Sequence, residues 1–244
     1  MIRLLRRRLT FGAGGPNEGQ MGLGTWVLSM LAGVGQIVRG RARGGWSSTQ
    51  YRWVLSEDWL PGGLPSVDPE VAEAELARLY LAAYGPATEP DLRWWAGWTV
   101  RQARRAVAAI GAAAVEVTEG QAYVLADDLE PVTAPEPSAA LLPALDPTVM
   151  GWARRAWYVG RHSALLFDRA GNAGPSAWWD GRAIGAWSQR PDGEIVVRVL
   201  EDVGGDAMAA LKAAAAELQA RLGTARVVVP FRSPPELASP SSAP

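Results

Sequence analysis

The side chains available for chemistry in this sequence are acids, amides and arginines, because there is no cysteine and only one histidine, His162. Thiol nucleophiles, disulfides and zinc sites built from Cys and His are therefore excluded. We expect no metal and no cofactor. The carboxylates that stand apart from obvious helices are Asp127, Asp128, Asp146, Asp168 and Asp180. Asp146 precedes proline and Asp180 precedes glycine, which is typical of turn residues.

Positive charge is concentrated at the start of the chain. Residues 1–55 contain eight arginines and one acid, Glu18, although the formal net charge of the whole chain is −1. Such segregation indicates contact with a polyanion, nucleic acid first and anionic lipid second. The alternative is a solvated basic segment without a partner.

The strongest candidate for nucleic-acid contact is a basic hairpin. Gln36–Arg39 is expected to form one strand and Trp46–Leu55 the next, with a glycine-rich turn at 40–45. This hairpin combines arginines with a ring that could stack on bases. The residues expected to contact DNA are Arg39, Arg41, Arg43, Trp46, Gln50 and Arg52.

A second set of arginines falls on a predicted recognition helix. Asp68, Thr88 and Thr99 are expected to cap three successive helices, and strands at 114–117 and 121–125 complete a winged helix. Arg101, Arg104 and Arg105 follow the spacing i, i+3 and i+4, so they project from one side of the third helix. We expect phosphate contacts from this side, and a merely solvated arginine face is the alternative.

The remainder of the chain is predicted to be rich in strands. We expect strands at Ala183–Ser188, Glu194–Leu200 and Ala225–Val229, and one long helix at Asp206–Leu222. Arg154, Arg155 and His162 flank an aromatic pair at 157–158 and are further candidates for DNA contact, with a plain surface helix as the alternative.

The predicted fold class is α+β, with two winged-helix units in tandem followed by a β-rich part with one long helix. The expected boundaries are a partial winged helix at 1–60, a complete one at 66–130, the β-rich part at 138–232 and a disordered tail at 233–244. No segment has the roughly 18 consecutive apolar residues of a membrane span, and no signal core follows the start. We expect a cytoplasmic protein.

Several short motifs are shared with one family. They are Gly85-Pro86-Ala87-Thr88, Asp91-Leu92, Trp94-Trp95-Ala96-Gly97, Leu142-Pro143-Ala144-Leu145-Asp146-Pro147-Thr148, Met150-Gly151-Trp152, Gly171-Asn172-Ala173-Gly174-Pro175 and Trp178-Trp179-Asp180-Gly181-Arg182. Over residues 22–237 the sequence resembles the AlkZ-like (YcaQ-type) winged-helix DNA glycosylases. The resemblance implies a protein that handles alkylated or cross-linked bases in DNA.

The resemblance also implies a catalytic Gln-x-Gln or Gln-x-Asp motif on the first winged helix, and this sequence has neither. Ile37 and Val38 follow Gln36, and Tyr51 and Arg52 follow Gln50, so we assign no catalytic residue and expect the catalytic part to lie upstream of Met1. The leading hypothesis is a monomeric protein that binds duplex DNA, including alkylated DNA, at the nucleoid without cutting it. An active glycosylase and a degenerate relic that does not bind DNA are the alternatives.

Overall fold

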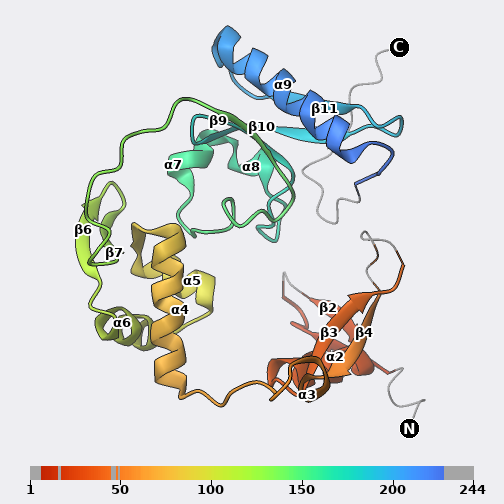
Figure 1. The fold of residues 1–244 in the computed structure, drawn as a ribbon, viewed down its shortest axis with the longest axis vertical. Helices are drawn as coiled ribbons and strands as arrows, with labels where there is room; N and C mark the ends of the chain where they lie inside the picture. The colour runs from red at the N-terminus through yellow and green to blue at the C-terminus, as the bar shows by residue number, and fades with distance from the viewer. Residues whose placement is uncertain (1–6, 16–17, 45–47, 49, 228–244) are drawn as a thin grey trace. The chain divides into compact units, whose positions relative to one another are not determined.

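The computed structural model describes residues 7–15, 18–44, 48 and 50–227. The chain divides into two compact units, Met1–Val67 and Asp68–Pro244. The division follows the glycine- and proline-rich segment 61–65, a composition typical of the connections between compact units. Helices and strands are mixed throughout (Figure 1).

In its described residues, the first unit consists of two small hairpins and two helices. Its elements are β1 (Arg8–Phe11), β2 (Gly19–Gly22), α2 (Leu23–Gly33), β3 (Ile37–Ala42), β4 (Tyr51–Leu55) and α3 (Ser56–Trp59). Strands β1 and β2 pair antiparallel, as do β3 and β4. The first hairpin was missed in the sequence because its strands are short and exposed. Among the described residues of this unit, only Ile37 and Ser56 are buried.

The second unit begins with a compact group of three helices and a three-stranded sheet. Its elements are α4 (Pro69–Tyr84), β5 (Ala87–Thr88), α5 (Glu89–Ala96), α6 (Val100–Ala109), β6 (Ala113–Val117) and β7 (Gly120–Val124), with strand order β5-β7-β6. The three predicted helix caps are confirmed. The Asp68 carboxylate accepts from the first turn of α4, and Thr88 and Thr99 each form a reciprocal capping box at the start of α5 and α6.

A four-stranded antiparallel sheet follows, in the order β11-β10-β9-β8. The elements are β8 (Ala139–Leu142), α7 (Ala156–Val159), η1 (Gly160–His162), α8 (Ser163–Leu166), β9 (Ser176–Trp179), β10 (Arg182–Gln189), β11 (Ile195–Val199) and α9 (Gly204–Leu222). The Asp180-Gly181 pair, with φ of 46° and 75°, makes the tight turn between β9 and β10. Asp180 is therefore a turn residue, as predicted.

Alternate residues of this sheet enter two different apolar clusters. Ala177 and Ile184 pack with Leu211 of α9, whereas Trp178 and Ala183 pack with the segment that contains α7 and α8. Figure 1 shows α9 along one side of the sheet and α7 and α8 on its other side. The predicted strand at 225–229 differs from the structure, since 225–227 have no strand conformation and 228–229 lie outside the described residues.

The helical group and the sheet are joined through the segment at 150–154. Tyr80 donates its hydroxyl to the Gly151 carbonyl at 2.9 Å, and the Trp152 indole donates to the Tyr84 carbonyl at 3.0 Å. A Cβ atom on Gly151 would lie 2.5 Å from the Tyr84 ring, so only glycine fits against it. These contacts hold residues 68–227 together as one compact body. No helix within the described ranges is both long and apolar enough to cross a lipid bilayer.

Candidate nucleic-acid interface

The β3–β4 hairpin carries an arginine that lies over two aromatic rings. Arg39 faces Trp53 across the ladder, and its guanidinium carbon is 5.4 Å from the ring centroids of both Tyr51 and Trp53. Arg39 is exposed, and Tyr51 is 44% exposed. Cation–π contacts of this kind are worth roughly 0.5–1 kcal/mol at exposed sites, enough to bias the arginine toward one arrangement. The hairpin thus presents a positioned cation and accessible rings on one face.

The other predicted hairpin residues lie in the same exposed element. Arg41, Arg43, Gln50 and Arg52 are exposed, and the Arg43 amide donates to the Gln50 carbonyl at 2.7 Å to close the hairpin. Within the described part of the chain, no carboxylate pairs with any of the four hairpin arginines. Trp46 lies outside the described residues. The hairpin is therefore a region of uncompensated positive charge.

The three arginines of helix α6 have different surroundings. The Arg104 guanidinium pairs with Glu89 at 2.6 Å, and Arg105 pairs with Glu70 and Glu73 of α4. These carboxylates raise the pKa of both arginines, mainly through the hydrogen bonds that Arg104 donates to Glu89 and Arg105 donates to Glu73. The periodicity of α6 alone could not show these pairs, because the acids come from two earlier helices.

Arg101 differs from the other two arginines of α6. It is exposed, and no ion pair involves it within the described ranges. Among the described residues, Arg101 is therefore the arginine of this set without a carboxylate partner, whereas Arg104, although exposed, and Arg105 are paired.

His162 is not available at the surface, contrary to its assignment as a DNA contact. Its side chain is 5% exposed, and its Nε2 lies 3.1 Å from the Glu201 carboxylate. Arg161 and Arg182 approach the same carboxylate, at 3.8 and 3.1 Å. Together they hold the pKa of Glu201 below its ordinary value, first through the hydrogen bond with His162. The local spacing Arg161-His162 suggested a basic surface, but the acid that pairs with both is 39 residues from His162 in the sequence.

Arg154 and Arg155, the neighbouring candidates, lie beside a small cavity. Arg154 is exposed, and its Nη1 donates to the Glu119 carbonyl at 2.8 Å. Arg155 is half-buried, and its guanidinium carbon lies 5.1 Å from the ring centroid of Trp94 and 4.3 Å from that of Phe167. Both arginines come from the loop that enters α7.

A buried carboxylate that the sequence did not identify as important fixes this loop. Asp91 is 2% exposed, and its Oδ1 accepts the backbone amides of Ala153 and Arg154, each at 2.9 Å. Its other oxygen completes the capping box with Thr88. The capping box was visible as a local motif, whereas the bonds to residues more than sixty positions away carry no local signal. Asp91 therefore positions the two arginines through their backbone.

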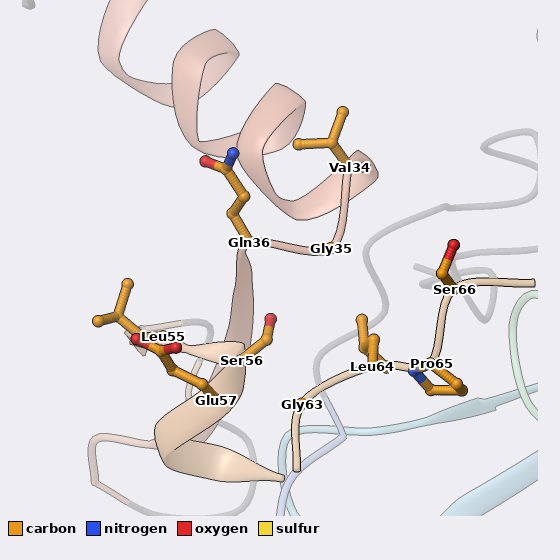
Figure 2. Close-up of a pocket in the computed structure, with 11 residues that line it drawn as sticks. Val34, Gly35, Gln36, Leu55, Ser56, Glu57, Gly63, Leu64, Pro65 and Ser66 are labelled. Atoms are coloured by element: carbon orange, nitrogen blue, oxygen red, sulfur yellow. The ribbon is translucent and has the colours of Figure 1, made fainter.

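The first unit contains a groove of about 700 Å³ between the end of α2 and the segment after α3. Figure 2 shows the Ser56 hydroxyl pointing toward the space beside Leu64, and this buried oxygen has no hydrogen-bond partner within the described residues. The Gln36 amide and the Glu57 carboxylate extend away from that space and from each other in Figure 2. The groove therefore does not bring an amide and a carboxylate together around one water.

The remaining acids do not form a metal site within the described part of the chain. The Asp168 carboxylate accepts from Ala170 and Asn172, and these bonds, first that of the Asn172 side chain, lower its pKa. Asp146 accepts from the Thr148 amide at 2.9 Å in a turn, as the sequence predicted. These two acids therefore stabilise loops.

Comparison with known proteins gives one consistent result. Residues 3–221 match the family model of the AlkZ-like DNA glycosylases. The chain is 28% identical over 215 residues to the "interstrand DNA cross-link repair glycosylase" of Streptomyces sahachiroi, covering 83% of this chain and 56% of that protein. It is also similar to the solved structure of the S. sahachiroi DNA glycosylase AlkZ, with a TM-score of 0.70 and 26% identity over 82% of this chain. The chain spans about half the length of these relatives, 56% in each comparison.

Proposed function

Since the chain belongs to the AlkZ-like family of DNA glycosylases, we propose that it is a DNA-repair protein that binds duplex DNA through the β3–β4 hairpin. The observation that carries the proposal is the set of four exposed hairpin arginines, Arg39, Arg41, Arg43 and Arg52, without a carboxylate partner in the described residues. Unpaired guanidinium groups on a projecting hairpin can reach phosphate oxygens without breaking an internal ion pair.

The order of elements supports a winged-helix interpretation. In the second unit, α4, β5, α5, α6, β6 and β7 follow the succession helix, strand, helix, helix, strand, strand, in which α6 takes the recognition position. In the first unit, α2 followed by β3 and β4 corresponds to a helix and its wing. On this interpretation each unit offers its own cationic groups to DNA, and the protein acts as a monomer at the nucleoid.

Most contacts in this proposal go to the DNA backbone. The hairpin arginines could also read guanine edges, and Gln50 could read adenine, but phosphate contact requires less precise geometry. Preference for damaged DNA would then come from duplex shape and deformability at the lesion. Affinity should fall steeply as salt concentration rises, because each neutralised phosphate releases bound counterions.

Base excision is the second candidate function. It is favoured by the relative named as an interstrand cross-link repair glycosylase and by the groove that ends at the unpartnered Ser56 hydroxyl. Hydrolysis of an N-glycosidic bond needs a group that stabilises the sugar cation and a positioned water. Because Gln36 and Glu57 diverge in Figure 2, we rank recognition of DNA ahead of base removal.

The test is fluorescence anisotropy with labelled duplexes, one plain and one carrying N7-alkylated guanine, over a series of salt concentrations. We compare the natural chain with the double variant Arg41→Gln/Arg43→Gln and with the charge-matched control Arg78→Gln/Arg221→Gln, whose arginines pair with Glu75 and Glu217. Loss of two phosphate contacts should reduce the slope of log K against log salt by about 1.8. The control should keep the natural slope.

A release assay on the alkylated duplex separates the two candidate functions. Salt-sensitive binding without base release supports recognition alone, and release that follows the protein concentration supports excision. Absence of binding to either duplex at low salt would refute both functions and would identify the chain as a non-binding member of its family.

A further inference from the structure

Arg155 is a half-buried cation whose guanidinium has no hydrogen-bond acceptor among the described residues. Its Nη1 is closed off from solvent and unpartnered. The group lies over the rings of Trp94 and Phe167, which hold it flat but accept no conventional hydrogen bond. Burial lowers the pKa of Arg155, because no carboxylate offsets the loss of water around its charge. Because Nη1 is closed off from solvent, a bound anion would accept instead from the guanidinium N–H groups that are open to solvent and have no acceptor among the described residues.

The same residue lines a cavity of about 410 Å³. Arg154 contributes a second cation, and the exposed hydroxyl of Ser163 lies on the cavity wall. Glu119 is the single carboxylate among the lining residues, and its backbone carbonyl accepts from Arg154. The rest of the wall is small or aliphatic: Ala153, Ala156, Val159 and Gly160. Two cations therefore face one acid in a space with few competing polar groups.

Gly160 gives the cavity its shape at the end of α7. It has φ of 57° and ψ of −138°, a combination that side-chain-bearing residues rarely adopt. This conformation lets the chain turn from α7 directly into η1, which is followed by the lining residue Ser163. Asp91 fixes the segment that carries the arginines through the backbone amides of Ala153 and Arg154. The site is thus fixed by backbone geometry from two sides.

We propose that this cavity binds one phosphate group of the DNA backbone, with the edge of the Arg155 guanidinium as the main donor. The inference rests on the proposed function, since it takes the phosphate from duplex DNA. A guanidinium fixed against rings presents adjacent N–H donors in the geometry that fits two phosphate oxygens. Arg154 adds a second charge, and Ser163 adds a hydroxyl donor.

The test uses the full chain with Arg155→Met, which keeps much of the packing against Trp94 and Phe167 but removes the charge and the donors. Affinity for the plain duplex should fall about ten-fold. The slope of log K against log salt should decrease by about 0.9. Arg221→Met is the matched control, because Arg221 is exposed and pairs with Glu217 on α9, and it should change neither value.

Arg155→Lys serves as a second variant and carries the test if Arg155→Met does not fold. Lysine keeps the charge but cannot form the two-pronged contact, so the salt slope should stay natural while affinity falls several-fold. Natural affinity in Arg155→Lys would overturn the two-pronged contact.

Titration with inorganic pyrophosphate by calorimetry distinguishes the failure of this inference from the failure of the proposed function. If the natural chain binds duplex and Arg155→Met binds it equally well, the proposed function stands and the phosphate site is refuted. If the natural chain binds no duplex but binds pyrophosphate in a manner that Arg155→Met abolishes, the cavity is an anion site and the DNA function fails. Absence of both kinds of binding overturns both proposals.

Discussion

At the scale of single residues, a buried carboxylate, Asp91, and a partly buried one, Glu201, connect segments of the second unit that are far apart in the sequence. One oxygen of Asp91 accepts hydrogen bonds at the start of its own helix, and the other accepts hydrogen bonds from the loop at 153–154. The Glu201 carboxylate pairs with Arg161 and His162, which are adjacent residues of η1, and with Arg182 at the start of β10. An ionised acid that accepts several hydrogen bonds at such a junction is worth more to the fold than an exposed ion pair.

The Glu201 junction predicts a specific pH dependence of stability. The pKa of Glu201 is lowered in the folded protein, so its contribution is complete above the unfolded pKa of about 4.3 and is lost as pH falls through the folded value. Glu201→Gln should therefore lower the free energy of unfolding by about 1 kcal/mol at pH 7. The difference in Tm between the natural chain and the variant should shrink as pH falls below about 4.

Thermal unfolding followed by circular dichroism across this pH range measures the difference. Glu217→Gln is the control, because Glu217 forms an exposed pair with Arg221 one helical turn away and should contribute little at any pH. A difference in Tm between the natural chain and Glu201→Gln that stays constant with pH would show that the side chain stabilises the fold by packing and not by its charge.

At the scale of elements, helix α6 tests whether an internal ion pair excludes an arginine from DNA contact. Arg101 is free within the described ranges, whereas Arg104 is paired with Glu89. Arg101→Gln should weaken duplex binding and reduce the salt slope by about 0.9, as expected for one lost phosphate contact. Arg104→Gln should leave both nearly unchanged. Equal losses in the two variants, measured by anisotropy, would mean that the Arg104–Glu89 pair opens when DNA binds.

Local signals in the sequence were sufficient to predict the helix ends and turns that are marked by nearby capping or turn residues. The caps at Asp68, Thr88 and Thr99 and the turn at Asp180-Gly181 were predicted and are present, because each depends on residues within a few positions. The pair β1–β2 was missed, since its strands depend on pairing with each other rather than on an alternating apolar pattern. Strands β8 and β9, the edge strand and its inner neighbour, were not predicted, since their register is set by pairing with distant segments.

The same difference between local signals and distant partners applies to the residues of the candidate site. The hairpin arginines were predicted from charge and turn composition, and the described ones are exposed as expected. Arg104, Arg105 and His162 were expected to be free for DNA contact, but each pairs with a carboxylate from another element, although the Arg104 side chain is still exposed. Sequence spacing shows which side chains share a face, whereas only the tertiary structure shows what lies opposite that face.

At the scale of the whole molecule, the two units differ in how much apolar surface they bury. All three apolar clusters of the described residues lie in the second unit. In the first unit, Trp26 and Met30 of α2 and Val34 at its C-terminal cap are 46%, 52% and 66% exposed. Burial of apolar side chains is the main favourable contribution to folding, so the first unit should be the less stable one.

Hydrogen exchange with mass spectrometry in increasing urea measures this difference directly. Amides of α2 and β3 should lose protection at lower urea concentrations than amides of β9 and β10, because local opening reflects local burial. Coincident loss of protection would mean that the two units unfold as one cooperative body.

The same measurement with duplex DNA present connects stability to function. A ligand that binds only the folded state raises the free energy of unfolding, by about 2.7 kcal/mol at one hundred times its Kd. If the β3–β4 hairpin is the principal contact, protection of β3 and β4 should persist to higher urea in the presence of duplex. High salt should remove this increase, since it weakens the phosphate contacts. Unchanged protection of the hairpin, with duplex demonstrably bound, would move the principal contact to the second unit and leave Arg101 and the Arg155 cavity as its main cationic groups.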